Sequence, residues 1–554
     1  MPMTALRISA VAFCLCSSVL SHAEEKRSQR NSRFFFDEPE ADEVLTQTGF
    51  DGSLVLTTLY FSESSQPFDL GGGTPGQNAS GVTRFFTDLR ARLDVEHIKG
   101  GRWHLRTDIR GRLTPGACRT QSRSSLDACT RFQSGSLSGN EIDFNQFYFT
   151  RSNAGSTWSI GRQFVSELTY TKVDGIRYDH KLTDKWKAIG FAGLYPALIS
   201  RDIRSDYPVL NDASTRTRRR SLPVTGGGGV AYEYGNYFGS FGGTVIAPLT
   251  KELGQLGNGA GGTGRIEKFR VFANAQGHAK LLSNLDVHHS AIFDVRGPSG
   301  PGFTNLGLGL HFRPFSGFRT YLQATRVSTD ILNVNAQSQL ETPGNQTNVV
   351  QNNVAVRRIS QESARLGATV SAFENRFELS SIVTARRRPR ITLISNAGNP
   401  IEFGAAKAVE VTVHAVDKYS FAGLRIGGYL THSLGIGKNN LNRGRYTSVG
   451  VDARRSFLHG KAEFDGSVTY LISTDETRSQ LCDPQNIETC YGSAATSLLG
   501  LTANGFYRFS DSWFVLGGLN LATQASNSIN IEGQRRRAPS ILMTTFFSRL
   551  AYRF

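Results

Sequence analysis

The chain has 554 residues, of which 39% are hydrophobic, and its mean hydropathy is −0.28. This composition excludes a bundle of membrane-spanning helices, because each such helix needs about 20 consecutive apolar residues. The formal net charge is +16, and Arg supplies 49 of the 62 basic residues. Arginine binds carboxylates and phosphates through two parallel hydrogen bonds, so this surplus indicates a surface that attracts anions. A basic surface covered only by water is the alternative.

The first 23 residues have the pattern of a secretory signal peptide. Arg7 gives a positive start, residues 8–20 form an apolar run, and residues 21–23 (Ser-His-Ala) are a cleavage site of the small-x-small type. A lipoprotein signal at Cys14 or Cys16 fits less well, because both lie inside the apolar run. We expect the chain to leave the cytoplasm with a net charge of +15, which argues against nucleic acid as a partner.

From about residue 51 to the end, stretches of 9–15 residues alternate apolar and polar side chains. Alternation with period two indicates β-strands that have two different faces. These stretches are longer than the strands of soluble sandwiches, which average about 5–6 residues. Their length suits a tilted membrane crossing of about 9–11 residues. The clearest examples are 83–97, 102–113, 268–280 and 376–386.

The connections between these stretches are alternately short and long, as in up-and-down barrels of the outer membrane. Ten short turns and eleven long loops predict an all-β fold, a single antiparallel transmembrane β-barrel of 22 strands. If some neighbouring hairpins are in fact one, the number of strands would be smaller, down to 16. The short turns are 97–101, 152–156, 182–185, 235–236, 281–284, 314–317, 373–375, 417–420, 457–460 and 509–512. The long loops are 63–81, 114–140, 165–174, 196–228, 248–264, 296–302, 328–355, 387–404, 435–443, 475–494 and 525–539.

The last eleven residues, TTFFSRLAYRF, place Leu550, Tyr552 and Phe554 on one face. This pattern resembles the C-terminal signal of bacterial outer-membrane proteins, although an edge strand that ends in Phe by chance would look alike. The resemblance covers residues 51–554 and names no single family. It implies the Gram-negative outer membrane as location and the barrel-assembly machinery as partner. We therefore divide the chain into a signal peptide (1–23), a short periplasmic segment (24–50) and the barrel (51–554).

Plugged, energy-coupled receptors resemble this chain in strand number. They carry a folded N-terminal plug far longer than residues 24–50, so no such plug is expected here. The resemblance leaves an open passage, or one closed by its own loops.

Two sets of basic residues are candidates for function. One set is expected to face the lumen and the other to lie at the outer rim. Pairing across hairpins is the alternative for the first, yet seven bases against four acids on 84–96 and 102–112 leave a surplus of three. The rim set is expected to contact lipopolysaccharide phosphates or to recruit an anionic solute or polysaccharide. The lumen set is Arg84, Arg90, Arg92, Arg102, Arg106, Arg110, Arg112, Arg386, Arg549 and Arg553, and the rim set is Arg218, Arg219, Arg220, Arg387, Arg388, Arg390, Arg535, Arg536 and Arg537.

No motif of an enzyme is present: the sequence lacks Gly-x-Ser-x-Gly, His-Glu-x-x-His and a P-loop. Asp286, His288 and Ser290 share one face of a strand, but alternate residues lie nearly 7 Å apart, too far for direct hydrogen bonds. We expect these three residues to line the lumen. No cofactor and no metal site is expected.

The sequence thus predicts a channel for passive transport of small solutes or an acidic polymer, with preference for anions. Arginine-rich walls are similar to those of anion-preferring porins and of barrels that export acidic polysaccharide. The alternative is a non-conducting barrel that anchors an envelope machine. Monomer and trimer both fit the sequence.

Four cysteines remain after signal cleavage, and each has a neighbour in the same polar segment. We predict the disulfides Cys118–Cys129 and Cys482–Cys490, because the chain folds in an oxidising compartment. Each would close a loop of about ten residues and contribute about 2–3 kcal/mol. Peptide mapping without reductant should find both local pairs, and a bridge between Cys118 and Cys482 would contradict this pairing.

Overall fold

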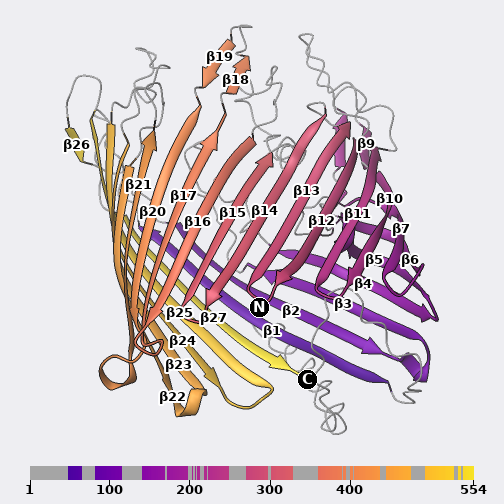
Figure 1. The fold of residues 1–554 in the computed structure, drawn as a ribbon, viewed down its shortest axis with the longest axis horizontal. Coiled ribbons are helices and arrows are strands. Elements are labelled where there is room, and N and C mark those ends of the chain that lie inside the picture. Colours follow the sequence, from indigo (N-terminus) through magenta and orange to yellow (C-terminus); the bar gives the residue numbers. More distant parts are fainter. Residues whose placement is uncertain are drawn as a thin grey trace.

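In the computed structural model the chain forms one large antiparallel sheet that is closed into a barrel (Figure 1). Besides the barrel and its short hairpins, the described residues form no other folded domain. They contain no helix that is long and apolar enough to cross a membrane. The described residues are 48–64, 82–114, 140–168, 171–196, 203, 206–207, 209–212, 217–220, 222–248, 270–296, 301–328, 360–389, 391–394, 400–403, 405–436, 445–475, 493–529, 535–537 and 541–554.

The sheet has 23 strands, of which β26 (Arg535–Arg537) only extends the end of β25, so 22 strands form the wall. The small hairpins β8–β9 (Val209–Asp212, Thr217–Arg220) and β18–β19 (Ile391–Ile394, Pro400–Phe403) are separate sheets. The strand number and the all-β up-and-down barrel agree with the sequence prediction. The wall strands are β1 (Gly49–Ser64), β2 (Val82–Glu96), β3 (Trp103–Leu113), β4 (Glu141–Asn153), β5 (Ser156–Val165), β6 (Thr171–Lys181), β7 (Trp186–Leu194), β10 (Pro223–Tyr234), β11 (Tyr237–Pro248), β12 (Arg270–Leu282), β13 (Leu285–Arg296), β14 (Gly302–Phe315), β15 (Phe318–Ser328), β16 (Ser360–Ala372), β17 (Phe377–Arg388), β20 (Ala406–Asp417), β21 (Arg425–Ile436), β22 (Arg445–Phe457), β23 (Ala462–Asp475), β24 (Ser493–Arg508), β25 (Trp513–Ile529) and β27 (Ile541–Arg553).

The barrel closes where the first strand pairs with the last. β1 and β27 run antiparallel, with Leu54 opposite Tyr552. The backbone groups of Gly52 and Phe554 exchange two hydrogen bonds, of 3.0 and 3.1 Å. A Cβ atom on Gly52 would lie 2.6 Å from Cζ of Phe554, so the terminal ring covers a residue that has no side chain. The final phenylalanine is therefore part of the seam.

All ten predicted short turns join consecutive wall strands at one end of the barrel. Four of the turns have only two residues between the strands, and in two of them a glycine, Gly155 (φ 74°) or Gly235 (φ 59°), adopts the left-handed conformation that is common in tight hairpins. Four short 3-10 segments complete the described elements: η1 (Ile98–Gly100), η2 (Ser166–Leu168), η3 (Phe421–Gly423) and η4 (Leu458–Gly460).

Three expected loop boundaries were wrong, and one of them is the start of the loop 525–539, because β25 continues to Ile529. Residues 226–228, all glycines, were placed in the loop 196–228, but β10 begins at Pro223 and contains them together with Gly229. Likewise β6 begins at Thr171 rather than after residue 174. A run of glycines in a sequence predicts a loop. Here the glycines leave space for neighbouring side chains, because a Cβ atom on Gly227 would lie 2.7 Å from the Phe191 ring.

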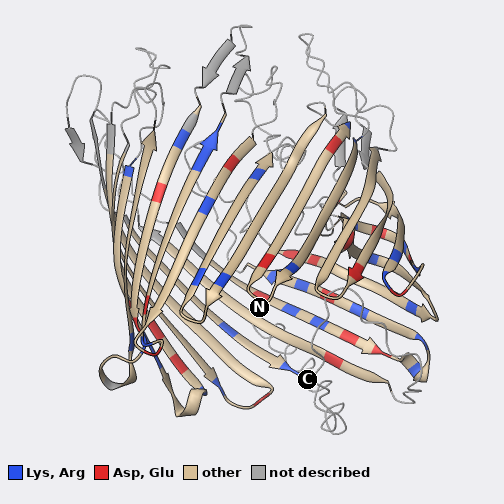
Figure 2. Ribbon diagram, in the orientation of Figure 1, with Lys and Arg blue, Asp and Glu red and all other residues tan. Residues whose placement is uncertain are grey.

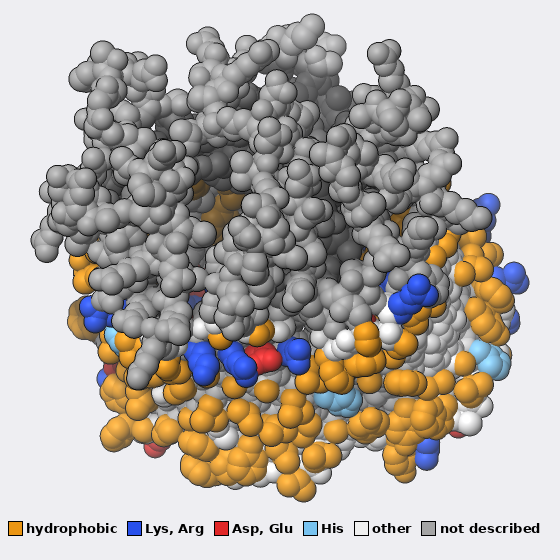
Figure 3. All heavy atoms as spheres, turned by 90° about the horizontal axis from the view of Figure 1, so that it is seen from above, with side chains coloured by type: hydrophobic (Ala, Val, Ile, Leu, Met, Phe, Trp, Pro, Cys, Tyr) orange, Lys and Arg blue, Asp and Glu red, His pale blue; other side chains and the backbone are white. Residues whose placement is uncertain are grey.

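The outward face of the wall is apolar. Leu89, Leu366 and Leu379 are about half exposed although they are hydrophobic, and the space-filling view shows a belt of such side chains (Figure 3). All four tryptophans of the chain lie near the ends of strands that carry the short turns: Trp103, Trp158, Trp186 and Trp513. Three of them pack on tyrosines, with ring centroids 4.3–4.6 Å apart. An apolar band with aromatic residues at its border is the surface of a membrane-spanning barrel.

Deleting Phe554 should sharply reduce assembly, because the seam loses two backbone hydrogen bonds and the ring that covers Gly52. The measurement is the heat-modifiable, folded fraction of the protein in outer-membrane preparations. F554Y keeps the ring and should assemble normally. Normal amounts of folded barrel without Phe554 would contradict this role.

Candidate functional site

Charged residues of both signs are concentrated along β2, β3 and β4 (Figure 2). On these strands Leu89, Trp103 and Ile142 face outward, so the residues that alternate with them face the lumen. Asp88 lies opposite Arg112 and Arg92 opposite Asp108, so the pairing across the hairpin that was the alternative is present here. The inner wall here is a continuous set of ion pairs.

Asp108 is the centre of this set. Arg90 donates two hydrogen bonds to it, at 2.7 and 2.5 Å, and Arg92 donates a third at 3.2 Å. On the other side Arg112 binds Asp88 at 2.7 and 3.0 Å. The carboxylate of Asp108 thus binds two guanidinium groups, those of Arg90 and Arg92.

The neighbouring strand β4 supplies acids that the sequence argument did not include. Glu141 accepts a hydrogen bond of 3.2 Å from Arg110 and lies 3.4 Å from Arg112. Asp143 lies 3.9 Å from Arg110. These two carboxylates reduce the local excess of positive charge. The excess that the sequence predicted for two strands is therefore smaller on the three-stranded surface.

In several of these ion pairs, however, the arginine side chain is more exposed to water than the side chain of its acidic partner. The side chain of Arg92 is 56% exposed, while that of its partner Asp108 is only 12% exposed. Arg319 and Glu378 show the same difference, at 57% and 19%, as do Arg386 and Glu410, at 45% and 17%. The long arginine side chain reaches past the shorter carboxylate. At these three pairs water therefore meets the guanidinium group more than the carboxylate.

A hollow of about 400 Å³ opens on this charged wall. Its lining includes Arg90, Arg92 and Arg106 against the two acids Asp94 and Asp108. A second hollow, of about 310 Å³, lies on the wall of β1, β23–β25 and β27 and has no charged lining residue. The described lumen thus has a charged sector and a neutral one.

The 3-10 segment η2, which follows β5, lies on the lumen side of the wall. Glu167 binds Arg177 at 2.8 Å and Lys187 at 3.1 Å. Its backbone oxygen accepts hydrogen bonds from Ser240, at 2.9 Å, and from Asn274, at 3.2 Å. These partners belong to β6, β7, β11 and β12, so the segment is fixed to four wall strands.

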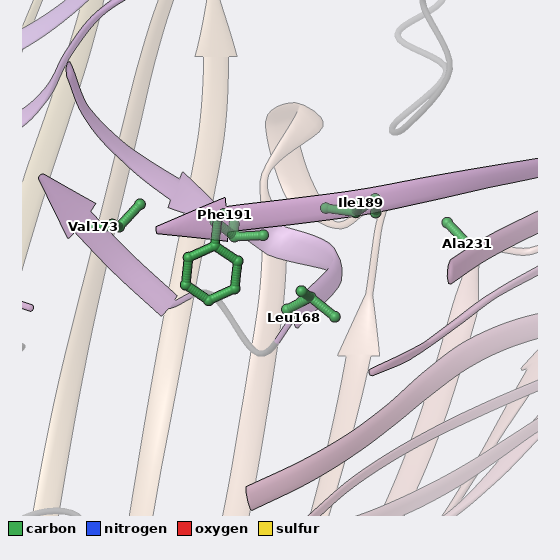
Figure 4. Close-up of a cluster of buried hydrophobic side chains, with 6 residues drawn as sticks. Leu168, Val173, Ile189, Phe191 and Ala231 are labelled. Carbon is green, nitrogen blue, oxygen red and sulfur yellow. The ribbon is translucent and has the colours of Figure 1, made fainter. Parts of the chain in front are cut away.

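Leu168 completes this anchor with a small apolar core (Figure 4). It is fully buried and lies against two glycines: a Cβ atom on Gly229 or Gly242 would come within 2.8 or 2.4 Å of its Cδ2 atom. Burial of a leucine side chain stabilises by about 1.5–3 kcal/mol. The other members of the core are Val165, Val173, Ile189, Phe191 and Ala231. No feature of the alternation pattern pointed to this segment; a leucine in a short polar loop was the only signal.

A buried arginine holds a second connection against the wall. Arg162 binds Asp174 at 2.6 and 2.5 Å and also binds Asp206, which is 1% exposed and belongs to the connection between β7 and β10. Tyr207 donates a hydrogen bond of 2.6 Å to Asp174. Sequence reasoning assigned no role to these residues, because Arg162 and Asp206 are 44 positions apart.

The remaining predicted residues lie in different places. In the lumen set, Arg102 donates to Asn153 at 3.3 Å and Arg549 to Thr57 at 3.3 Å, while Arg553 is on β27 and Arg84 is described only in its backbone on β2. Of the rim set, Arg387 lies 3.7 Å from Glu362 and Arg388 is the last residue of β17. Arg218, Arg219 and Arg220 are in β9 and Arg535, Arg536 and Arg537 form β26, all described only in their backbone. Arg390, Cys118, Cys129, Cys482 and Cys490 lie outside the described residues. Their roles stay predictions.

Asp286, His288 and Ser290 are on β13 and share its inward face. The ring of His288 lies 5.5 Å from that of His311, and Asp286 lies 4.0 Å from His278. Among the described residues no hydrogen bond joins the three, and no group of three or more His, Cys, Asp or Glu could hold a metal ion. The arrangement is a polar lining.

Fold and surface define the class of this protein: it is a transmembrane β-barrel of the outer-membrane type. No protein-family model matches the sequence, and no curated protein matches it. Among solved structures the chain is similar to OccAB4 of Acinetobacter baumannii, with 8% identity, a TM-score of 0.38 and coverage of 93% of this chain and 100% of that one. It is also similar to the siderophore receptor PirA from the same species, with 10% identity, a TM-score of 0.46 and coverage of 92% of this chain and 81% of that one. A BenF-like porin from Pseudomonas fluorescens Pf-5 is similar with 8% identity, a TM-score of 0.37 and coverage of 91% of this chain and 99% of that one.

Glu167 gives a prediction that depends on pH. Burial alone would raise the pKa of this carboxyl group, but the charges of Arg177 and Lys187 outweigh burial and lower the pKa to about 2. Its stabilisation should therefore be complete above the ordinary pKa of 4.5 and be lost as the pH falls towards 2. At pH 7, E167Q should lower the free energy of unfolding by about 3 kcal/mol, because two cations lose a buried partner.

The measurement is the unfolding midpoint of the purified barrel at several pH values. E374Q, in an exposed turn, is the control and should match the wild type. A difference between E167Q and the wild type that stayed constant from pH 7 to pH 2 would be inconsistent with an ionised anchor.

Proposed function

We propose that this protein is an outer-membrane channel for the passive transport of small solutes, with preference for anions. The observation that carries the proposal is the exposure of the arginines: on the lumen side Arg92, Arg319 and Arg386 face water, while their acidic partners are largely covered. A solute that enters the lumen would meet positive charge first, although most of that charge is formally paired.

The inward segment supports small solutes over a polymer. Ser166–Leu168 lies on the lumen side of β11 and β12 and reduces the free cross-section there. Charges in water are screened within about 8 Å at physiological ionic strength. A narrowed passage keeps the solute within that distance of the wall, so selectivity by the arginines requires such a constriction.

R92Q/R106Q is the variant that tests this function. Both side chains are more than half exposed and line the charged hollow. The wild type should prefer anions in a planar bilayer under a salt gradient, and the variant should move the reversal potential towards zero. The preference should weaken as the salt concentration rises, since the charges are screened.

R151Q/R455Q is the matched control, because it removes two arginines that stack on outward-facing Trp103 and Phe457. Its selectivity should equal that of the wild type. Clear cation selectivity of the wild type would disprove the basic-lumen proposal. A correctly folded barrel without conductance would favour the scaffold instead.

A further inference from the structure

A row of charged residues crosses the outward face of four neighbouring strands, β15, β16, β17 and β20. Arg326 lies opposite Glu362, Glu362 opposite Arg387, and Arg387 opposite Lys407. Figure 3 shows basic side chains beside an acidic one at the edge of the hydrophobic belt. The row holds three basic residues and one acidic residue.

The register shows that this row faces lipid rather than the lumen. Four residues further into each strand, the aligned positions are Leu322, Leu366, Val383 and Val411, which are all exposed and apolar. The row between them consists of small residues, Ala324, Ala364, Ala385 and Val409. The charged row therefore borders the apolar band at the end opposite to the short turns, where the outer leaflet begins.

The charges of this row are poorly balanced by the protein. Arg387 lies 3.7 Å from Glu362, which is the one acid of the row. The Nε atom of Arg326 is buried without a hydrogen-bond partner, and Lys407 is exposed. Charges beside hydrocarbon are costly unless an opposite charge or water meets them. At the other border of the band, tryptophans pack on tyrosines, and the cations Arg151, Lys185 and Arg455 stack on aromatic rings.

We propose that Arg326, Arg387 and Lys407 form a binding site for a glycolipid of the outer leaflet that carries two phosphates, with Glu362 lowering the net positive charge of the row. Guanidinium groups bind phosphate through paired, charge-assisted hydrogen bonds, and lysine adds a mobile point charge. The row of small residues leaves space beside the charges for the sugar and the first methylenes of the acyl chains. This site lies on the outer wall, so it does not depend on conduction through the lumen.

The test uses the full-length barrel in detergent with bisphosphorylated lipid A as the probe and native mass spectrometry as the readout. R326Q/R387Q/K407Q should bind lipid A at least about tenfold more weakly than the wild type. R151Q/K185Q/R455Q removes the same charge from the opposite border, where each cation stacks on an aromatic ring, and should bind like the wild type.

Three further binding measurements complete the test. Dephosphorylated lipid A should bind weakly to all variants, and inorganic phosphate should not compete with the lipid. E362Q keeps the three cations and removes the acid nearest the phosphates, so it should bind lipid A more tightly. Equal losses in both triple variants, full competition by phosphate, or no gain in E362Q would each overturn the proposal.

Discussion

The hydrocarbon of a membrane offers no water to backbone N–H and C=O groups, so a sheet that spans it must have no open edge. In this chain that requirement is met by the pairing of β1 with β27, and the two hydrogen bonds between Gly52 and Phe554 end the seam. Closure also separates the two faces of every strand. The same alternation that puts leucines into lipid puts arginines and carboxylates around the lumen.

Inside a closed barrel, the chemical character of the lumen depends on which member of each ion pair reaches the water. Asp108 stays near the wall while Arg92 extends beyond it, whereas in the pair of Arg112 and Asp88 the carboxylate is the more exposed partner. The wall then presents positive charge with only a small net excess. In the proposed function, the segment that Glu167 anchors narrows the lumen, so that solutes pass within the screening distance of this charge. In this proposal, the exposed arginines and the narrowed lumen therefore act together to select anions.

Strand pattern and turn positions could be predicted from sequence because both are local properties. Alternation over 102–113 and the short turn at 235–236 need no knowledge of distant residues. What escaped prediction depends on contacts across the barrel. Glu141 neutralises Arg110 from the next strand, and Ser166 binds Gln276, which is 110 positions away. The glycines at 226–228 looked like a loop because their role is to accept Phe191.

The account rests on a water-filled lumen in which the exposed arginines act on solutes, and accessibility at Gln146 tests that most directly. Gln146 lines the charged hollow without contributing charge. Single-channel recordings of Q146C should show that an anionic, thiol-specific methanethiosulfonate reagent changes the conductance faster than a cationic reagent of similar size, while the wild type does not respond. Faster reaction with the cationic reagent, or no reaction at all, would contradict a basic aqueous passage.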